Sequence, residues 1–174
     1  MDKCVRDVLT RVLEYPPIVV FGKPCRQRRC IGFFSNVAMG YAYSGQLAKS
    51  QPLTDNLATL MKHINTQFQS DFNGILVNVY NDGNDYISAH SDDERALGKS
   101  GVVAISVGAV RKFRIRDKTT KRIVCDIPMR PYTIIKMSGD FQKEFTHEVP
   151  KEKKVKGRRV SFTFRKHLRP SGAA

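Results

Sequence analysis

The stretch NVYNDGNDYISAHSD, residues 78–92, places a tight turn between two short β-strand patterns. The turn, Asn81-Asp82-Gly83-Asn84, is made of residue types that favour turns. Side chains two residues apart in an extended strand point to the same face, so His90 and Asp92 would present an imidazole and a carboxylate side by side. His147, far along the chain, could complete a set of two histidines and one carboxylate. Such a set covers one face of an octahedral metal ion and leaves the other positions open, as in non-heme ferrous oxygenases.

Short strand patterns dominate the chain from residue 74 onward, and turn residues separate them, as at Ser138-Gly139-Asp140. Seven or eight strands at this spacing predict a mainly β fold, a double-sheet jelly roll. The expected strands are 74–80, 86–91, 102–107, 111–116, 122–127, 131–137, 145–149 and 158–166.

The first part of the chain is different. Apolar residues at helical spacing predict amphipathic helices over residues 2–14 and 54–69, the second capped by Thr54, and we expect both to flank the sheets. Residues 18–21 are expected to form a strand. Residues 24–45 are expected to be irregular, and they interleave aromatic with basic side chains. Such a segment could stack bases beside phosphates, or its aromatics could simply pack on the core.

Length and composition favour a single globular domain over residues 1–174. The net charge of +14 is one-sided: residues 1–98 carry 10 Lys and Arg against 10 Asp and Glu, whereas residues 99–174 carry 20 against 6. This asymmetry favours a polyanion such as nucleic acid over a merely solubilising surface. A charged N-terminus, scattered cysteines and no membrane-spanning apolar run lead us to expect an intracellular protein, nuclear or cytoplasmic and not secreted, with reduced thiols.

Two strand patterns place polar groups on one face. Asn78 and Tyr80 share a face in residues 74–80, and an inward pair of this kind needs a polar partner. In residues 159–165 the alternate positions hold two guanidiniums and two hydroxyls, at Arg159, Ser161, Thr163 and Arg165. An inward Arg could bind the far carboxylate of a 2-oxo acid whose other end chelates the metal. Alternatively, this strand is an edge and both arginines face water.

Five motifs together resemble the AlkB family of iron- and 2-oxoglutarate-dependent nucleic-acid dealkylases, over residues 18–168. They are Asn78-Val79-Tyr80, His90-Ser91-Asp92-Asp93-Glu94, Ser106-Val107-Gly108-Ala109-Val110-Arg111, His147-Glu148-Val149-Pro150 and Arg159-Val160-Ser161-Phe162-Thr163-Phe164-Arg165. The resemblance implies a double-stranded β-helix that holds Fe(II) through His90, Asp92 and His147 and uses dioxygen. It implies 2-oxoglutarate binding by Asn78, Tyr80, Arg159, Ser161, Thr163 and Arg165. Arg165 is the expected partner of the distal carboxylate, and Ser161 stands where most members carry Asn.

The resemblance also implies how substrate is bound. The segment Tyr41-Ala42-Tyr43-Ser44-Gly45 is similar to the family's nucleotide-recognition segment, which we expect to span residues 18–45. Phe21-Gly22-Lys23 is similar to a hairpin of members acting on duplex DNA, although Phe21 could instead be an ordinary core residue. The implied substrate-binding residues are Phe21, Lys23, Phe34 (which would cover the flipped base), Tyr41, Tyr43, Ser44, Asp93 and Glu94 (the last two near the base).

The implied reaction is oxidative demethylation of 1-methyladenine or 3-methylcytosine in DNA or RNA, with release of succinate, carbon dioxide and formaldehyde. The expected partner is alkylated DNA or RNA, and the expected state is a monomer. Two alternatives remain open. A 2-oxoglutarate oxygenase acting on protein side chains would keep the metal set without needing the aromatic and basic segment, and a nucleic-acid-binding jelly roll would lack the chemistry.

Overall fold

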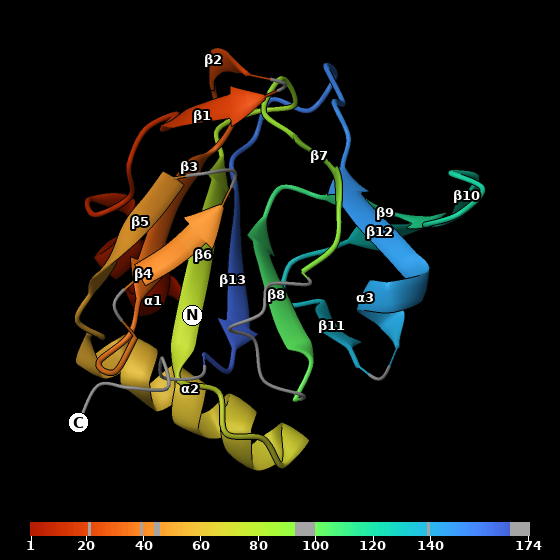
Figure 1. Ribbon diagram of the computed structural model, residues 1–174. Coiled ribbons are helices and arrows are strands. Elements are labelled where there is room, and N and C mark those ends of the chain that lie inside the picture. Colours follow the sequence, from red (N-terminus) through yellow and green to blue (C-terminus); the bar gives the residue numbers. More distant parts are fainter. Residues whose placement is uncertain (21, 39, 44–45, 93–99, 139, 168–174) are drawn as a thin grey trace.

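Two β-sheets face each other in the computed structural model, which describes residues 1–20, 22–38, 40–43, 46–92, 100–138 and 140–167 (Figure 1). The larger sheet has the order β11-β8-β13-β6-β3-β5-β4, and the smaller sheet has the order β10-β9-β12-β7. The strands of the larger sheet are β11 (Ile134–Met137), β8 (Val102–Gly108), β13 (Arg159–Arg165), β6 (Gly74–Tyr80), β3 (Cys30–Phe34), β5 (Gln46–Gln51) and β4 (Gly40–Tyr43). Those of the smaller sheet are β10 (Ile123–Met129), β9 (Arg111–Asp117), β12 (Phe145–Val149) and β7 (Ile87–His90). This architecture confirms the predicted jelly roll.

The centre of the larger sheet is formed by β6 and β13, which are antiparallel and place Asn78 opposite Ser161. Their apolar positions, such as Val77 and Phe162, belong to a core on the outer face of the sheet. Their polar positions face the smaller sheet. The alternation predicted for both strands is therefore confirmed, and it directs one polar row from each strand into the space between the sheets.

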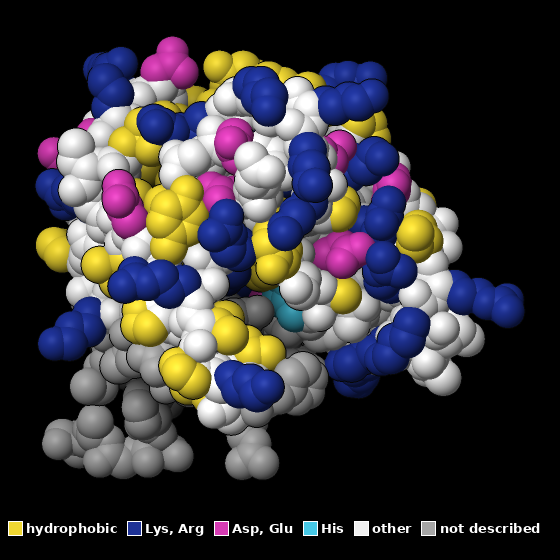
Figure 2. Space-filling model, turned by 90° about the horizontal axis from the view of Figure 1, so that it is seen from above, with side chains coloured by type: hydrophobic (Ala, Val, Ile, Leu, Met, Phe, Trp, Pro, Cys, Tyr) yellow, Lys and Arg dark blue, Asp and Glu magenta, His cyan; other side chains and the backbone are white. Residues whose placement is uncertain are grey.

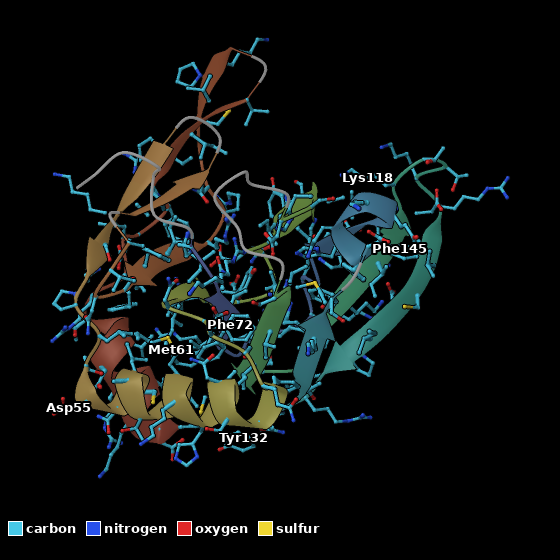
Figure 3. The ribbon with its side chains drawn as sticks, turned by 60° about the horizontal axis from the view of Figure 1, so that its bottom comes forward. Asp55, Met61, Phe72, Lys118, Tyr132 and Phe145 are labelled. Atoms are coloured by element: carbon cyan, nitrogen blue, oxygen red, sulfur yellow. The ribbon has the colours of Figure 1, made fainter. Side chains whose placement is uncertain are left out.

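Helices α1 (Asp2–Leu9) and α2 (Asp55–Phe68) cover the outer face of the larger sheet and complete that core. The Oγ1 atom of Thr54 accepts a 3.2 Å hydrogen bond from the amide of Leu57, which confirms the predicted cap. Figure 3 shows α2 running across the sheet from Asp55 past Met61. Within the described part of the chain, no helix combines the length and the apolar character needed to cross a bilayer.

Two expectations for the first part of the chain are wrong. The first helix ends at Leu9 instead of residue 14, because Leu13 pairs with Ile31 through two backbone hydrogen bonds of 2.7 and 3.0 Å. Residues 24–45 contain strands as well as loops. Strand β3 is buried on both faces and so lacks the alternation that identifies a half-exposed strand.

A hairpin of β1 (Pro17–Val20) and β2 (Lys23–Arg26) projects from the sandwich beside the start of β7, at the top of Figure 1. At the other side, the short helix α3 (Phe141–Glu144) leads into β12. Figure 3 labels Lys118 and Phe145 on either side of this helix. The Lys118 ammonium donates a 3.1 Å hydrogen bond to the carbonyl of Gln142, which ties α3 to the end of β9.

Candidate metal and cosubstrate site

Strands β7 and β12 bring the two predicted histidine ligands together. His90 and His147 are register partners, and their ring centroids are 4.3 Å apart. The Asp92 carboxylate lies beside both: Oδ1 is 3.9 Å from Nε2 of His90, and Oδ2 is 3.8 Å from Nε2 of His147. One ligand atom from each residue lies within 4.8 Å of the others, so a single ion could contact all three. The predicted set of two histidines and one carboxylate is therefore assembled.

The reason for the position of Asp92 differs from the prediction. Strand β7 ends at His90, so Asp92 is not placed by strand alternation. Instead, its backbone amide donates a 2.8 Å hydrogen bond to Oε1 of Gln142, and the hydroxyl of Ser91 donates one of 2.9 Å to the carbonyl of Phe145. The segment is thus held by α3 and the start of β12.

The environment prepares the three groups to bind a cation. The Nδ1 atom of His90 lies 2.8 Å from the carbonyl of Ser88, which can only accept, so Nδ1 carries the proton and Nε2 faces the other ligands. Burial lowers the pKa of His147 to about 3, and it also lowers the pKa of His90, so both imidazoles are neutral at pH 7. Burial alone would raise the pKa of Asp92, but the charge and hydrogen bond of Arg165 and the nearby histidines leave it below its ordinary value.

The donor set fits a ferrous ion. Asp92 is 5% exposed, and its Oδ2 atom accepts no hydrogen bond from any residue in the described ranges. A buried carboxylate oxygen without a donor is costly unless a cation satisfies it. Two neutral imidazoles and one carboxylate are the donors that non-heme iron takes in oxygenases.

The opposite wall of the pocket comes from the larger sheet. Asn78, Tyr80 and the four polar positions of β13 line it, as predicted from their parity. The alternative of an edge strand is excluded, because β13 lies between β8 and β6, with Arg159 and Arg165 only 2% and 3% exposed. The cavity among these groups is small, about 40 Å³.

The two arginines occupy opposite ends of this wall. Arg165 lies at the metal end, where its Nη2 donates a 2.8 Å hydrogen bond to Oδ1 of Asp92. Arg159 lies six residues earlier on the strand, and its Nε donates a 2.8 Å hydrogen bond to Oγ of Ser106. A 2-oxo acid that chelates the metal points its distal carboxylate away from the metal. The position of Arg165 beside Asp92 favours Arg159 as the partner of the distal carboxylate, and the role expected of Arg165 stays a prediction.

Several residues that support the site were missed in the sequence. Arg29 is buried in the pocket wall, and its Nε donates a 2.7 Å hydrogen bond to Oδ1 of Asn78. Ser106 is buried beside Arg159, and its inward position on β8 could have been found from its place opposite Ser161. No sequence signal identifies Gln142, which acts on Asp92 from 50 residues away.

Arg111 supports the site by holding the loops around it. Its buried guanidinium donates hydrogen bonds of 2.9, 2.8 and 2.7 Å to the carbonyls of Asp82, Asp85 and Pro150. Its Cζ lies 5.7 Å from the ring centroid of Tyr80, and that of Arg159 lies 5.2 Å from it. The Arg111 guanidinium thus joins the loop at Asp82 and Asp85, the loop at Pro150 and the pocket residue Tyr80. Its role is therefore structural.

The structure describes only two of the residues predicted to bind substrate closely enough to place their side chains. Phe34 is fully buried on the helix side of the larger sheet, so the prediction that it covers a base is wrong: alternation along β3 turns Phe34 outward and Phe33 toward the other face. Lys23 is exposed on β2. The remaining predictions lie outside the described residues or side chains: Phe21, Tyr41, Tyr43, Ser44, Asp93 and Glu94.

The fold and the site together define a class of protein, the non-heme iron oxygenases that use a 2-oxo acid as cosubstrate. Residues 4–165 match the model of the family described as the 2OG-Fe(II) oxygenase superfamily. The chain is similar to human "DNA oxidative demethylase ALKBH2", with 31% identity over 159 residues that cover 87% of this chain and 61% of the human protein. It is similar to rat "Alpha-ketoglutarate-dependent dioxygenase alkB homolog 3", with 38% identity over 118 residues that cover 63% of this chain and 40% of the rat protein.

The fold is also found in a solved structure titled "The structure of OsALKBH1", with a TM-score of 0.63, 13% identity, and coverage of 95% of this chain and 90% of that one. The chain belongs to the 2OG-Fe(II) oxygenase superfamily, in its AlkB branch. The cofactor and cosubstrates of this family are Fe(II), 2-oxoglutarate and dioxygen, and the predicted resemblance is confirmed.

Proposed function

We propose that the protein demethylates N-alkylated bases, such as 1-methyladenine and 3-methylcytosine, in DNA or RNA. In this reaction 2-oxoglutarate and dioxygen are consumed, the methyl group is hydroxylated, and succinate, carbon dioxide and formaldehyde are released with the restored base. The observation that carries the proposal is the set His90, Asp92 and His147 facing Arg159 and Arg165 across one pocket, in a chain whose relatives include one named as a DNA oxidative demethylase.

Iron held by His90, Asp92 and His147 would supply, with its cosubstrates, the oxidising power that breaks the methyl C–H bond. The chain's own part is binding, orientation and exclusion of water. Arg159, beside the Ser106 hydroxyl, would hold the distal carboxylate of 2-oxoglutarate. Arg165 would keep Asp92 ionised and oriented while lying close enough to the metal to meet the carboxylate at the near end.

Surface charge supports a nucleic-acid substrate. Arg114 and Arg116 are neutralised across the smaller sheet by Asp126 and Glu148, at 2.7 and 2.8 Å. Glu152 is the one acidic residue in the sequence of the loop before β13, and it pairs with Arg111, so the loop is strongly basic and its exposed cations suit contact with phosphates. These cations are Lys151, Lys153, Lys154, Lys156 and Arg158.

We propose that residues 18–45 form the nucleotide-recognition segment of a single domain spanning residues 1–174, and that the protein is intracellular and monomeric. Substrate contacts are proposed for Phe21, Lys23, Tyr41, Tyr43 and Ser44. Asp93 and Glu94 follow the metal ligand Asp92 in the sequence, and we propose that their carboxylates contact the reacting base. The proposed lesions are cationic, so these carboxylates would favour them over neutral bases.

The test is demethylation of matched single- and double-stranded DNA and RNA carrying one lesion, with iron and 2-oxoglutarate added or withheld. The expected result is formation of the restored base and equal amounts of formaldehyde and succinate, only when both are present. A methylated peptide serves as the comparison substrate. Turnover of the peptide alone would overturn the proposal in favour of a protein oxygenase, and binding of oligonucleotide without any succinate release would leave only a binding domain.

A further inference from the structure

The short helix α3 lies against two of the three proposed metal ligands. Its residue Gln142 accepts the 2.8 Å hydrogen bond from the backbone amide of Asp92. Its residue Phe141 packs beside the ring of His147, with 6.2 Å between the ring centroids and 44° between the ring planes. A shift of this one helical turn would therefore disturb both Asp92 and His147.

Such a short helix depends on partners outside itself. It spans only four residues, and the carbonyls at the C-terminal end of a helix have no partner within it. Lys118 supplies two donors to these carbonyls. Its backbone amide donates a 2.8 Å hydrogen bond to the carbonyl of Glu144, and its ammonium donates one of 3.1 Å to the carbonyl of Gln142. Lys118 thus caps the end of α3, as lysine side chains can do at helix C-termini.

The backbone of Lys118 is itself held in a tight turn. Asp117, the last residue of β9, accepts hydrogen bonds of 3.0 and 2.6 Å at Oδ1 from the amides of Thr119 and Thr120. The Lys121 ammonium donates a 2.6 Å hydrogen bond to the carbonyl of Lys118. An ordered turn therefore presents the Lys118 side chain to α3.

We propose that Lys118 is a positioning residue of the metal site, which keeps Asp92 and His147 in place through α3. No lysine is among the described residues that line the pocket, so Lys118 acts without touching metal or cosubstrate. The inference rests on the metal site of the proposed function. It adds to that site a residue of the β9–β10 turn, a segment that carries no metal ligand.

The sign of the effect on metal affinity separates positioning from charge. A nearby ammonium repels a cation, so the loss of its charge alone would tighten metal binding. The loss of a positioning contact would weaken metal binding instead. Figure 2 shows Lys and Arg side chains spread over one face of the molecule, so the removal of a single lysine changes the field of the whole surface only slightly.

The test is calorimetric titration of the metal-free protein with Mn²⁺ or Co²⁺. Lys118→Met keeps an unbranched side chain but removes the donor, and it is expected to weaken binding by about tenfold, the lower end of the effect usual for groups that orient metal ligands. Lys118→Arg keeps a donor and should recover part of the affinity. The matched control is Lys112→Met, which removes an exposed lysine of the same strand whose ammonium lies 3.8 Å from Asp126. It should bind metal at least as tightly as the wild-type protein.

A double variant shows whether Lys118 acts through α3. In a Gln142→Ala background, Lys118→Met should weaken metal binding by less than it does alone, because part of the contact that it supports is already gone. The visible absorption of bound Co²⁺ depends on coordination geometry. It should change in Lys118→Met and stay as in the wild-type protein in Lys112→Met.

Unchanged or tighter metal binding by Lys118→Met would overturn the inference, as would equal weakening in the Gln142→Ala background. If Lys118→Met does not fold at the temperature of the titration, Lys118→Gln, with its shorter and uncharged side chain, takes its place with the same expectations. The role of Lys118 and the proposed function can fail separately. Weaker metal binding by Lys118→Met, in a protein whose wild type demethylates no oligonucleotide, would support the role of Lys118 and count against the function. A wild-type protein that binds no metal would overturn both.

Discussion

The backbone amide of Asp92 and the side chain of Gln142 are joined by a 2.8 Å hydrogen bond that spans 50 residues of sequence. Strand β7 ends at His90, so the strand itself does not fix Asp92. The hydrogen bond to Gln142 fixes the carboxylate ligand of the metal site instead. The Nε2 atom of Gln142 also donates a 3.8 Å hydrogen bond to the sulfur of Met137, which lines the pocket. The carboxylate ligand is thus positioned by α3.

Gln142→Ala is expected to weaken metal binding by about 10- to 100-fold, the usual effect of losing a group that orients a ligand. Titration calorimetry with Mn²⁺ or Co²⁺ in place of iron measures this without turnover. Gln142→Glu keeps an acceptor for the Asp92 amide and should recover part of the affinity. An Ala variant with unchanged metal affinity would show that Ser91 alone holds the segment.

Asp92→Ala should abolish succinate formation coupled to demethylation, since two histidines alone are a poor iron site. The measurement is succinate and restored base produced by the same sample. Asp126→Ala is the matched control, because it removes an exposed carboxylate of the smaller sheet that pairs with Arg114. Full activity of the Asp92 variant would remove this residue from the metal site.

Arg159→Ala and Arg165→Ala should separate the two ends of the cosubstrate site. Loss of a charge-assisted contact of about 1.5–3 kcal/mol predicts a rise of roughly 10- to 100-fold in the KM for 2-oxoglutarate for Arg159→Ala, with metal affinity unchanged. Arg165→Ala should lower metal affinity as well, because Arg165 holds Asp92. Calorimetric titration with metal and with 2-oxoglutarate distinguishes the two variants. The reverse pattern would show that Arg165, and not Arg159, binds the distal carboxylate.

Metal-free protein should lose stability as the pH falls from about 6.5 toward 4. Burial lowers the pKa of His167 to about 4, so between these values the unfolded chain takes up a proton that the folded protein does not. For this residue the free energy of unfolding should drop by on the order of 1–2 kcal/mol between pH 7 and pH 5. Urea unfolding at the two pH values measures the drop, which should be smaller in His167→Gln; an equal drop would assign it elsewhere, for example to His147.

The sequence was most informative where a strand has one apolar and one polar face. The strands β6 and β13 alternate, so their inward residues and the arginine pair were predictable, and their bounds were predicted to within one residue. Strand β3 is apolar on both faces, and with Phe33 and Phe34 adjacent, no pattern told which of them faces the site. Leu13 ended the first helix early through pairing with Ile31, a contact between segments that periodicity cannot reveal.

Roles that depend on three-dimensional order were also beyond the sequence. That His90 and His147 meet was expected from residue type together with the family resemblance, whereas the arrangement of Arg159 and Arg165 depends on which end of β13 approaches Asp92. Gln142 and Arg29 act through hydrogen bonds to residues 50 and 49 positions away in the sequence, and their residue types are ordinary for surface loops.

The metal ligands belong to the smaller sheet and its extension, while Asn78, Arg159 and Arg165 belong to the larger one. A loaded centre would therefore act as a removable cross-link between two halves of the sandwich. A metal held by the smaller sheet alone, or a dicarboxylate held by the larger sheet alone, would leave the sheets unlinked, whereas a dicarboxylate bound to the metal would join them. Binding of both the metal and the dicarboxylate should raise the melting temperature by more than the sum of their separate effects. The melting temperature would therefore report the fraction of enzyme that holds both.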